Sequence, residues 1–194
     1  DNNLSDVSFL EYLTNLKYLN LDFNHISNIN SISKLTKLKL LSLDSNNVSN
    51  INALIRLKNL RNLIISFNKI SNISVLKTFS KIKLLSLAGN NIKDIQVLYT
   101  IYSLESLNLA HNEVTTINSE FIKFFPKMKR LSLYNNPIKN IDKAVFGDSN
   151  YYNCLTDLRN YWEDIEQGKT INNEVKILLV GNGGVGKTQI CLLY

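Results

Sequence analysis

The chain has 194 residues, 44% of them hydrophobic, and a net charge of +6. This length and composition suit one packed domain or one and a half, and only 7 Gly and 2 Pro argue against long flexible linkers. No signal peptide and no apolar run of about 18 residues occur, so we expect no transmembrane segment. The basic residues are spread along the chain rather than gathered in a tract, so we expect no nucleic-acid partner.

The two cysteines, Cys154 and Cys191, stand in unlike contexts with no others around them. A secreted repeat protein of this size usually carries several disulfides. We therefore expect a cytoplasmic protein in which both cysteines are small buried hydrophobic residues.

One pattern recurs along most of the chain. Its first copy is Leu16, Leu19, Leu21, Asn24, Ile26 and Ile29. The asparagines mark the period, because Asn24, Asn46, Asn68, Asn90 and Asn112 are each 22 residues apart and Asn136 follows after 24. Alternating apolar residues before each asparagine predict a short strand, and a spacing of three after it predicts a 3₁₀-like return. No copy can bury its apolar set alone, so the copies must stack.

This pattern resembles the leucine-rich-repeat family in its short, 22-residue class, from Asp1 to about Phe146. The resemblance implies a solenoid with short parallel strands on a concave face and 3₁₀ or irregular segments on the convex side. Its first residues match the second half of a repeat, so we expect an array that starts mid-repeat, with further repeats upstream.

Two local features refine the prediction. We expect the repeated asparagines to turn inward and to bond the backbone of their own and the next repeat, because a buried amide needs partners. Phe121, Phe124 and Phe125 before Pro126 predict a short convex helix that fills the core locally.

Strand positions between the inward leucines should line the concave face. One predicted column is Tyr18, Leu40, Asn62, Leu84, Ser106 and Arg130, and the next is Asn20, Ser42, Ile64, Ser86, Asn108 and Ser132. The candidates for contact with a partner protein are Tyr18, Phe23, Ile64, Phe67 and Tyr134; the alternative is that several of them only cover the ladder. No catalytic group is indicated, since His25 and His111 hold different repeat positions and an Asp22–Asp44 pair on an open face is more often solvated.

A basic column is predicted beside the strands, at Lys17, Lys39, Arg61, Lys83 and Lys129, with Glu105 interrupting it. This column is either a solvated face or a docking strip for an acidic partner or anionic lipid.

Beyond the repeats, Leu155, Leu158, Trp162 and Ile165 form one apolar stripe of a helix that Gly168 ends. Because an exposed last repeat needs a lid, we expect this helix to cap the array, with Trp162 and one of Tyr151 and Tyr152 against the last coil. The predicted division is a solenoid over 1–150, the cap and a connector over 151–173, and a third unit over 174–194.

The third unit starts with an apolar run over 175–180, typical of a strand buried on both faces. A motif of the form G-x-x-x-x-G-K-S/T follows, made of Gly181, Asn182, Gly183, Gly184, Val185, Gly186, Lys187 and Thr188. Its glycines let backbone N–H groups surround a phosphate, Lys187 neutralises the β and γ oxygens, and Thr188 offers its hydroxyl to Mg²⁺. The predicted fold class is therefore α/β: a leucine-rich-repeat solenoid followed by an incomplete P-loop domain.

Leucine-rich repeats, a capping helix and then this P-loop resemble the Roco family, in which the repeats precede a Ras-like GTPase domain called Roc and a dimerising COR domain. The resemblance implies GTP or GDP and Mg²⁺ as cofactors of a complete domain, with dimerisation through downstream domains. The implied function is a protein-interaction scaffold attached to the start of a GTPase domain. Residues 1–194 alone are not expected to hydrolyse GTP. The alternatives are a pure scaffold with a non-functional P-loop and an ATP-dependent signalling switch.

Overall fold

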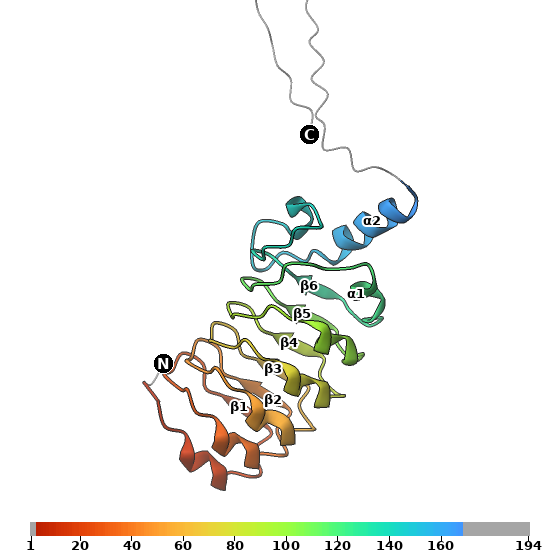
Figure 1. Ribbon diagram of the computed structural model, residues 1–194. Helices are drawn as coiled ribbons and strands as arrows, with labels where there is room; N and C mark the ends of the chain where they lie inside the picture. The colour runs from red at the N-terminus through yellow and green to blue at the C-terminus, as the bar shows by residue number, and fades with distance from the viewer. Residues whose placement is uncertain (1–2, 169–194) are drawn as a thin grey trace, which may run out of the picture.

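The computed structural model describes residues 3–168 and contains one sheet of six short parallel strands in chain order (Figure 1). The strands are β1 (Tyr18–Asn20), β2 (Leu40–Ser42), β3 (Asn62–Ile64), β4 (Leu84–Ser86), β5 (Ser106–Asn108) and β6 (Arg130–Ser132). Each strand pairs in parallel with the next. The predicted solenoid with parallel strands is confirmed, and the predicted strand and P-loop over 174–194 lie outside the described residues.

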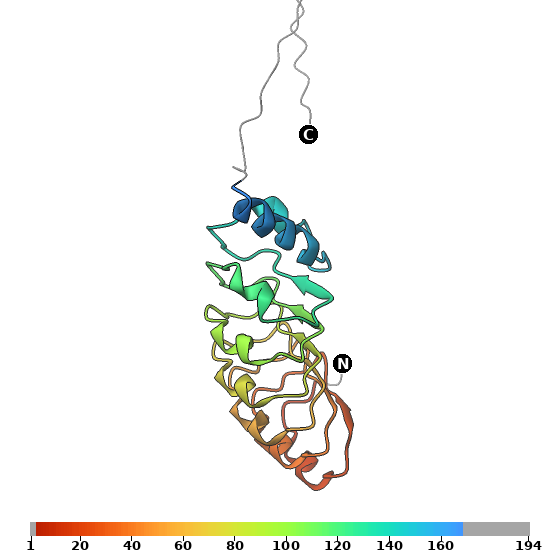
Figure 2. The same cartoon turned by 90° about the vertical axis from the view of Figure 1, so that its right-hand side faces the viewer.

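The returns between strands are mostly 3₁₀ helices, stacked along the side opposite the strands (Figure 2). The returns are η2 (Asn30–Lys34), η3 (Asn52–Arg56), η4 (Ser74–Thr78) and η5 (Gln96–Thr100), and η1 (Ser8–Tyr12) stacks under η2 ahead of β1. A further 3₁₀ helix, η6 (Lys143–Phe146), follows β6 and contacts α2 (Leu155–Glu166). Ile26, Ile29 and Ile32 are at most 1% exposed, so the apolar side chains spaced by three face the interior. The side chain two residues before each of η2–η5 accepts a bond from the first backbone N–H, as Asn28 does from Asn30 at 3.0 Å.

The repeated asparagines tie each coil to its neighbour. Asn46 donates from Nδ2 to the carbonyl oxygens of Leu43 and Asp44 in its own repeat and of Leu21 in the preceding one. Its Oδ1 accepts from the Ile26 N–H at 3.0 Å. Asn68, Asn90 and Asn112 repeat the arrangement. The inward amides are therefore confirmed, but the neighbour they bond is the preceding repeat and not the next, because the side chain points back along the array.

The predicted short helix is present as α1 (Glu120–Lys123). Phe121 on the helix and Phe125 just after it are buried, and Tyr99 from the preceding repeat stacks on Phe124 with ring centroids 4.9 Å apart. The longer repeat therefore fills extra core volume with aromatic rings, in agreement with the predicted role as local core filler.

The last coil is covered by α2 (Leu155–Glu166) and the residues just before it. Leu155 and Leu158 are buried, and Trp162 packs against the core. Before the helix, Asn153 accepts from the Leu131 N–H at 2.9 Å and donates to the Lys129 carbonyl, and Cys154 N–H donates to the Leu131 carbonyl. These bonds satisfy the open edge of β6 in place of a seventh strand.

Helix α2 ends as the glycine signal predicts. Gly168 has a φ of 69°, the left-handed conformation that favours glycine after a helix, and its N–H donates to Ile165. Burial raises the pKa of the Cys154 thiol to about 12, so this cysteine is the buried hydrophobic residue that was predicted. Within residues 3–168, no helix has the length and apolar character needed to cross a bilayer.

Replacing Asn68 by Leu tests the asparagine bonds. The Asn68 side chain bonds the Val48 N–H and three carbonyls, while the residue is only 8% exposed. Because buried groups left unpaired cost about 1–3 kcal/mol each, we expect Asn68→Leu to lose about 3 kcal/mol or more of folding stability. The melting temperature, followed by circular dichroism, should fall by about 10 °C.

The matched control is Asn62→Leu on the strand face, whose register neighbours are already Leu40 and Leu84. This control should change stability by no more than about 0.5 kcal/mol. Equal melting temperatures for the two variants would contradict the structural role of the buried amide.

Candidate binding surface

The outward positions of the six strands form one continuous surface, called here the strand face. The predicted columns are confirmed by the pairing, which places Tyr18, Leu40, Asn62, Leu84, Ser106 and Arg130 side by side and does the same for Asn20, Ser42, Ile64, Ser86, Asn108 and Ser132. These residues are mostly small and polar, with isolated apolar side chains among them. Such a surface leaves room for a partner over the floor of the sheet.

Two adjoining hollows of about 270 and 250 Å³ lie on the strand face. Both are lined by Ile64, Ser86, Asn108, Asn150 and Tyr151. Asn150 and Tyr151 come from the loop between η6 and α2, and Tyr151 is 84% exposed. This loop therefore borders the strand face, and Tyr151 does not pack on the last coil as one prediction allowed. The place of this loop beside the strand face was not predictable, because the loop lies outside the repeat pattern.

Its neighbour Tyr152 packs closely within the same loop. A Cβ added to Gly147, which has a φ of 70°, would lie 2.1 Å from the Tyr152 ring. The Tyr152 hydroxyl donates to Asp157 on α2 at 2.6 Å. Only glycine at 147 leaves room for the Tyr152 ring against the backbone. In this position the Tyr152 hydroxyl reaches Asp157 and links the loop to α2.

A hydrogen-bonded polar row crosses the first part of the strand face. Asp22 Oδ1 accepts from the Ser42 hydroxyl at 2.6 Å and from the Asp44 N–H at 2.7 Å. Ser66 and Ser86 continue the row through their hydroxyls, 2.8 Å apart. Burial, together with the Asp22 charge, raises the pKa of the Asp44 carboxyl. The two aspartates are neighbours, as predicted, and they are held by serines and backbone rather than aimed at a catalytic partner.

The residue before each repeated asparagine has a left-handed backbone. Phe23, Ser45, Phe67 and His111 have φ between 51° and 55°, and Gly89 takes the same position with a φ of 62°. This conformation costs a non-glycine residue about 1–2 kcal/mol. The Phe67 ring lies over Gly89, where an added Cβ would come within 2.5 Å of it. Two phenylalanines thus carry backbone strain at exposed positions, a combination found at functional surfaces.

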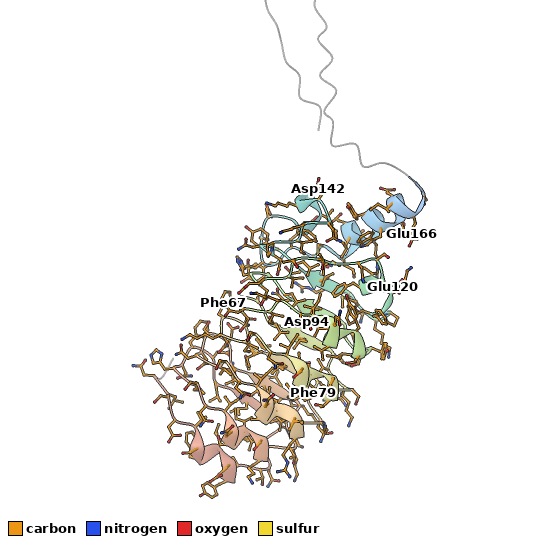
Figure 3. All side chains as sticks on the ribbon, viewed as in Figure 1. Phe67, Phe79, Asp94, Glu120, Asp142 and Glu166 are labelled. Carbon is orange, nitrogen blue, oxygen red and sulfur yellow. The ribbon has the colours of Figure 1, made fainter. Side chains whose placement is uncertain are left out.

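The five predicted contact residues divide into two groups. Phe67 lines one hollow and Ile64 lines both, and Figure 3 shows Phe67 on the side of the array away from Asp94 and Glu120. Tyr18 and Phe23 are 65% and 60% exposed near the first strand, and Tyr134 is half-buried against the His111 ring. The structure brings Ile64 and Phe67 together at the hollows but leaves the other three outside them. Contact of all five residues with a partner stays a prediction.

The two histidines are separated, as their repeat positions indicated. His25 is exposed in the first repeat, whereas His111 is bonded through Nδ1 to Asn135 at 2.7 Å and through Nε2 to Asn150. His111 thus links the fifth repeat to the loop between η6 and α2. Residues 3–168 contain no group of three or more His, Cys, Asp or Glu side chains placed to hold a metal ion.

The predicted basic column is confirmed as a row of adjacent positions. The Lys39 N–H donates to the Lys17 carbonyl, and the same contact joins Arg61 to Lys39 and Lys83 to Arg61. Glu105 does not simply interrupt the row, because it accepts from Lys83 at 2.7 Å and from Lys129 at 2.8 Å. Bonds from Lys129 and Lys83, with their charges, lower the pKa of the Glu105 carboxyl to about 2. Glu105 therefore offsets one of the two lysine charges at this end of the row and leaves the other end fully cationic.

Comparison with known proteins agrees with this fold. Residues 12–29 match a family model described as a leucine-rich repeat, and residues 102–145 match one described as leucine-rich repeats in two copies. The chain contains leucine-rich repeats, a scaffold for protein interaction.

The fold is shared with solved structures of other proteins. An internalin of Listeria monocytogenes is 28% identical with a TM-score of 0.68, covering 71% of this chain and 40% of its own. A leucine-rich-repeat protein of Leptospira interrogans is 28% identical with a TM-score of 0.64, covering 71% and 36%. One curated relative, named a Roc-COR-CHAT protease, from an unknown prokaryotic organism, is 37% identical over 67 residues, which is 34% of this chain and 6% of the relative. The chain thus spans less than half of each of these three proteins.

The strain at Phe23 gives a test of whether its exposed ring is needed for folding. Phe23→Asn places a residue that tolerates the left-handed conformation where Phe23 has a φ of 55° and is 60% exposed. We expect folding stability to stay the same or to rise by up to about 1 kcal/mol, measured by urea unfolding. The buried control Phe79→Ala should lose about 3–5 kcal/mol. A loss above about 1 kcal/mol for Phe23→Asn would show that the ring is structural.

Proposed function

We propose that the chain is the protein-binding arm of a Roco-type regulatory GTPase. In this proposal residues 1–150 are the solenoid, 151–173 the cap and connector, and 174–194 the start of the nucleotide-binding domain. The observation that carries it is the order along the chain: leucine-rich repeats, then a capping helix, then the motif over 181–188. ATP-dependent switches with leucine-rich sensors usually carry the repeats after the nucleotide domain, so the order favours the GTPase.

The curated relative adds support. Its name contains Roc and COR, the two domains that follow the repeats in the Roco family. The match covers 34% of this chain, so it supports the proposed class of protein but assigns no role to individual residues.

The motif residues would bind GTP or GDP with Mg²⁺. Gly181, Gly183, Gly184 and Gly186 would form the backbone cradle, with Asn182 and Val185 between them. Lys187 would neutralise phosphate oxygens, and Thr188 would ligate Mg²⁺. One strand and a helix start cannot make a nucleotide site alone, so residues 1–194 should bind phosphate weakly and hydrolyse no GTP.

The strand face would bind the partner. Most of its side chains are small and polar, and Ile64 and Phe67 line the hollows as apolar anchors. Tyr18 and Phe23 extend the same face toward the first strand, where both are exposed. Because the repeats form one stacked body, a partner on this face contacts several repeats at once.

Nucleotide binding by the parent protein, carrying a whole domain after Thr188, tests the proposal. We expect unlabelled GTP to displace a fluorescent GTP analogue at least tenfold better than ATP does. Lys187→Ala should abolish binding, because the lysine neutralises phosphate charge, while Lys176→Ala in the apolar run over 175–180 should leave it unchanged.

Two results would contradict the proposal. Better displacement by ATP than by GTP would favour the ATP-dependent switch. Absence of nucleotide binding in a folded parent protein would favour a pure scaffold.

A further inference from the structure

Half of the cationic residues, although scattered in the sequence, gather along one edge of the solenoid. The segments that lead into the six strands are residues 12–17, 34–39, 56–61, 78–83, 100–105 and 124–129, here called the basic edge. They hold 11 cationic residues and one acidic residue, a net charge of +10. The cations are Lys17, Lys34, Lys37, Lys39, Arg56, Lys58, Arg61, Lys81, Lys83, Lys127 and Lys129. The rest of the chain has 11 cationic and 15 acidic residues, a net charge of −4, so the positive charge of the protein belongs to this edge.

Stacking of the repeats creates the edge. Residues 22 apart in the sequence become neighbours, as the bond of Lys37 Nζ to Asn15 and that of Lys81 Nζ to Asn59 show. Adjacent parallel strands lie about 4.8 Å apart, so Lys17, Lys39 and Arg61 stand as a row of closely spaced like charges. Mutual repulsion within such a row opposes folding, and binding to an anionic surface would relieve this repulsion.

Most of these charges have no internal counter-charge. Within residues 3–168, the ion pairs of the basic edge are those of Lys83 and Lys129 with Glu105. The other nine cations face solvent or polar groups, and Lys39 alone among the 11 is half-buried rather than exposed. The hollows described above lie on the strand face, so the basic edge is a separate surface.

Exposed apolar side chains stand among the cations. Tyr12 at the end of η1 is 79% exposed, and Leu13 beside it is 46% exposed. Tyr102, which follows η5, is 59% exposed. Tyrosines and lysines together are typical of surfaces that rest at the headgroup level of a bilayer, where a tyrosine ring meets both apolar and polar groups.

We propose that the basic edge docks the solenoid onto an anionic phospholipid bilayer. Nine of its 11 cations are lysines, which act as flexible point charges, and lysine is depleted in specific protein–protein interfaces whereas arginine is enriched. A long, evenly spaced lysine row fits a diffuse layer of phosphate headgroups better than a structured acidic protein. Docking by this edge leaves the strand face open, so a bilayer and a protein partner can be bound together.

Vesicle co-sedimentation tests the proposal directly. The chain should bind vesicles of phosphatidylcholine with phosphatidylglycerol and should not bind vesicles of phosphatidylcholine alone. Binding should weaken steeply as sodium chloride is raised, since the attraction is electrostatic. The triple variant Lys17→Glu, Arg56→Glu, Arg61→Glu should bind about 100-fold more weakly, since each basic residue near an anionic surface contributes about fivefold.

The matched control changes the same net charge elsewhere. Lys69→Glu, Lys139→Glu and Lys143→Glu alter exposed residues outside the basic edge and should reduce vesicle binding less than tenfold. Equal losses in the two triple variants would overturn the proposal, because net charge rather than the edge would then be responsible. Binding to polyglutamate without binding to the anionic vesicles would also overturn it, in favour of an acidic protein. The salt dependence of the unaltered chain decides the matter if the edge variant does not fold, and salt-insensitive binding would count against the proposal.

Discussion

The fold depends on the amide group of one asparagine in each repeat. Its Nδ2 donates within its own coil and to the preceding coil, and its Oδ1 accepts from a backbone N–H of the preceding coil, as Asn90 does from Ile70 at 2.9 Å. The turn after each strand can therefore be buried without orphaned polar groups. Apolar contacts supply most of the favourable free energy, but they are non-directional, and the amide fixes the register in which the coils stack.

This constraint also decides which residues are free to serve function. The leucines and the asparagine of each repeat are committed to the interior, so variation is confined to outward strand positions, the turn and the edges. The left-handed turn position shows the consequence, because it holds Ser45 and Gly89 beside the strained, exposed Phe23 and Phe67. The basic edge is a second surface that is free to vary, since cations from five of its six segments face outward. One stacked core thus presents two chemically different surfaces.

The repeat period made the fold and the strand-face columns predictable, because a shift of 22 residues places equivalent positions side by side. The direction of the asparagine bonds and the backbone strain at Phe23 were not predictable, since both depend on how the turn bends in three dimensions. Asn150 and Tyr151 at the hollows were missed because they belong to a loop outside the repeat. The pairing of Glu105 with two lysines needed the actual distances between side chains. The P-loop motif over 181–188 stays a prediction, because it lies outside the residues that the structure describes.

Native-state hydrogen exchange tests most directly whether the asparagines hold the coils together. The amide protons of Val48 and Ile70, which are bonded to Asn68 and Asn90 of the following repeat, should exchange only through global unfolding. The Asn30 N–H is also bonded to an asparagine oxygen, that of Asn28, but within an exposed turn, so it should exchange by local opening and much faster. Exchange of Val48 and Ile70 as fast as that of Asn30 would contradict the account.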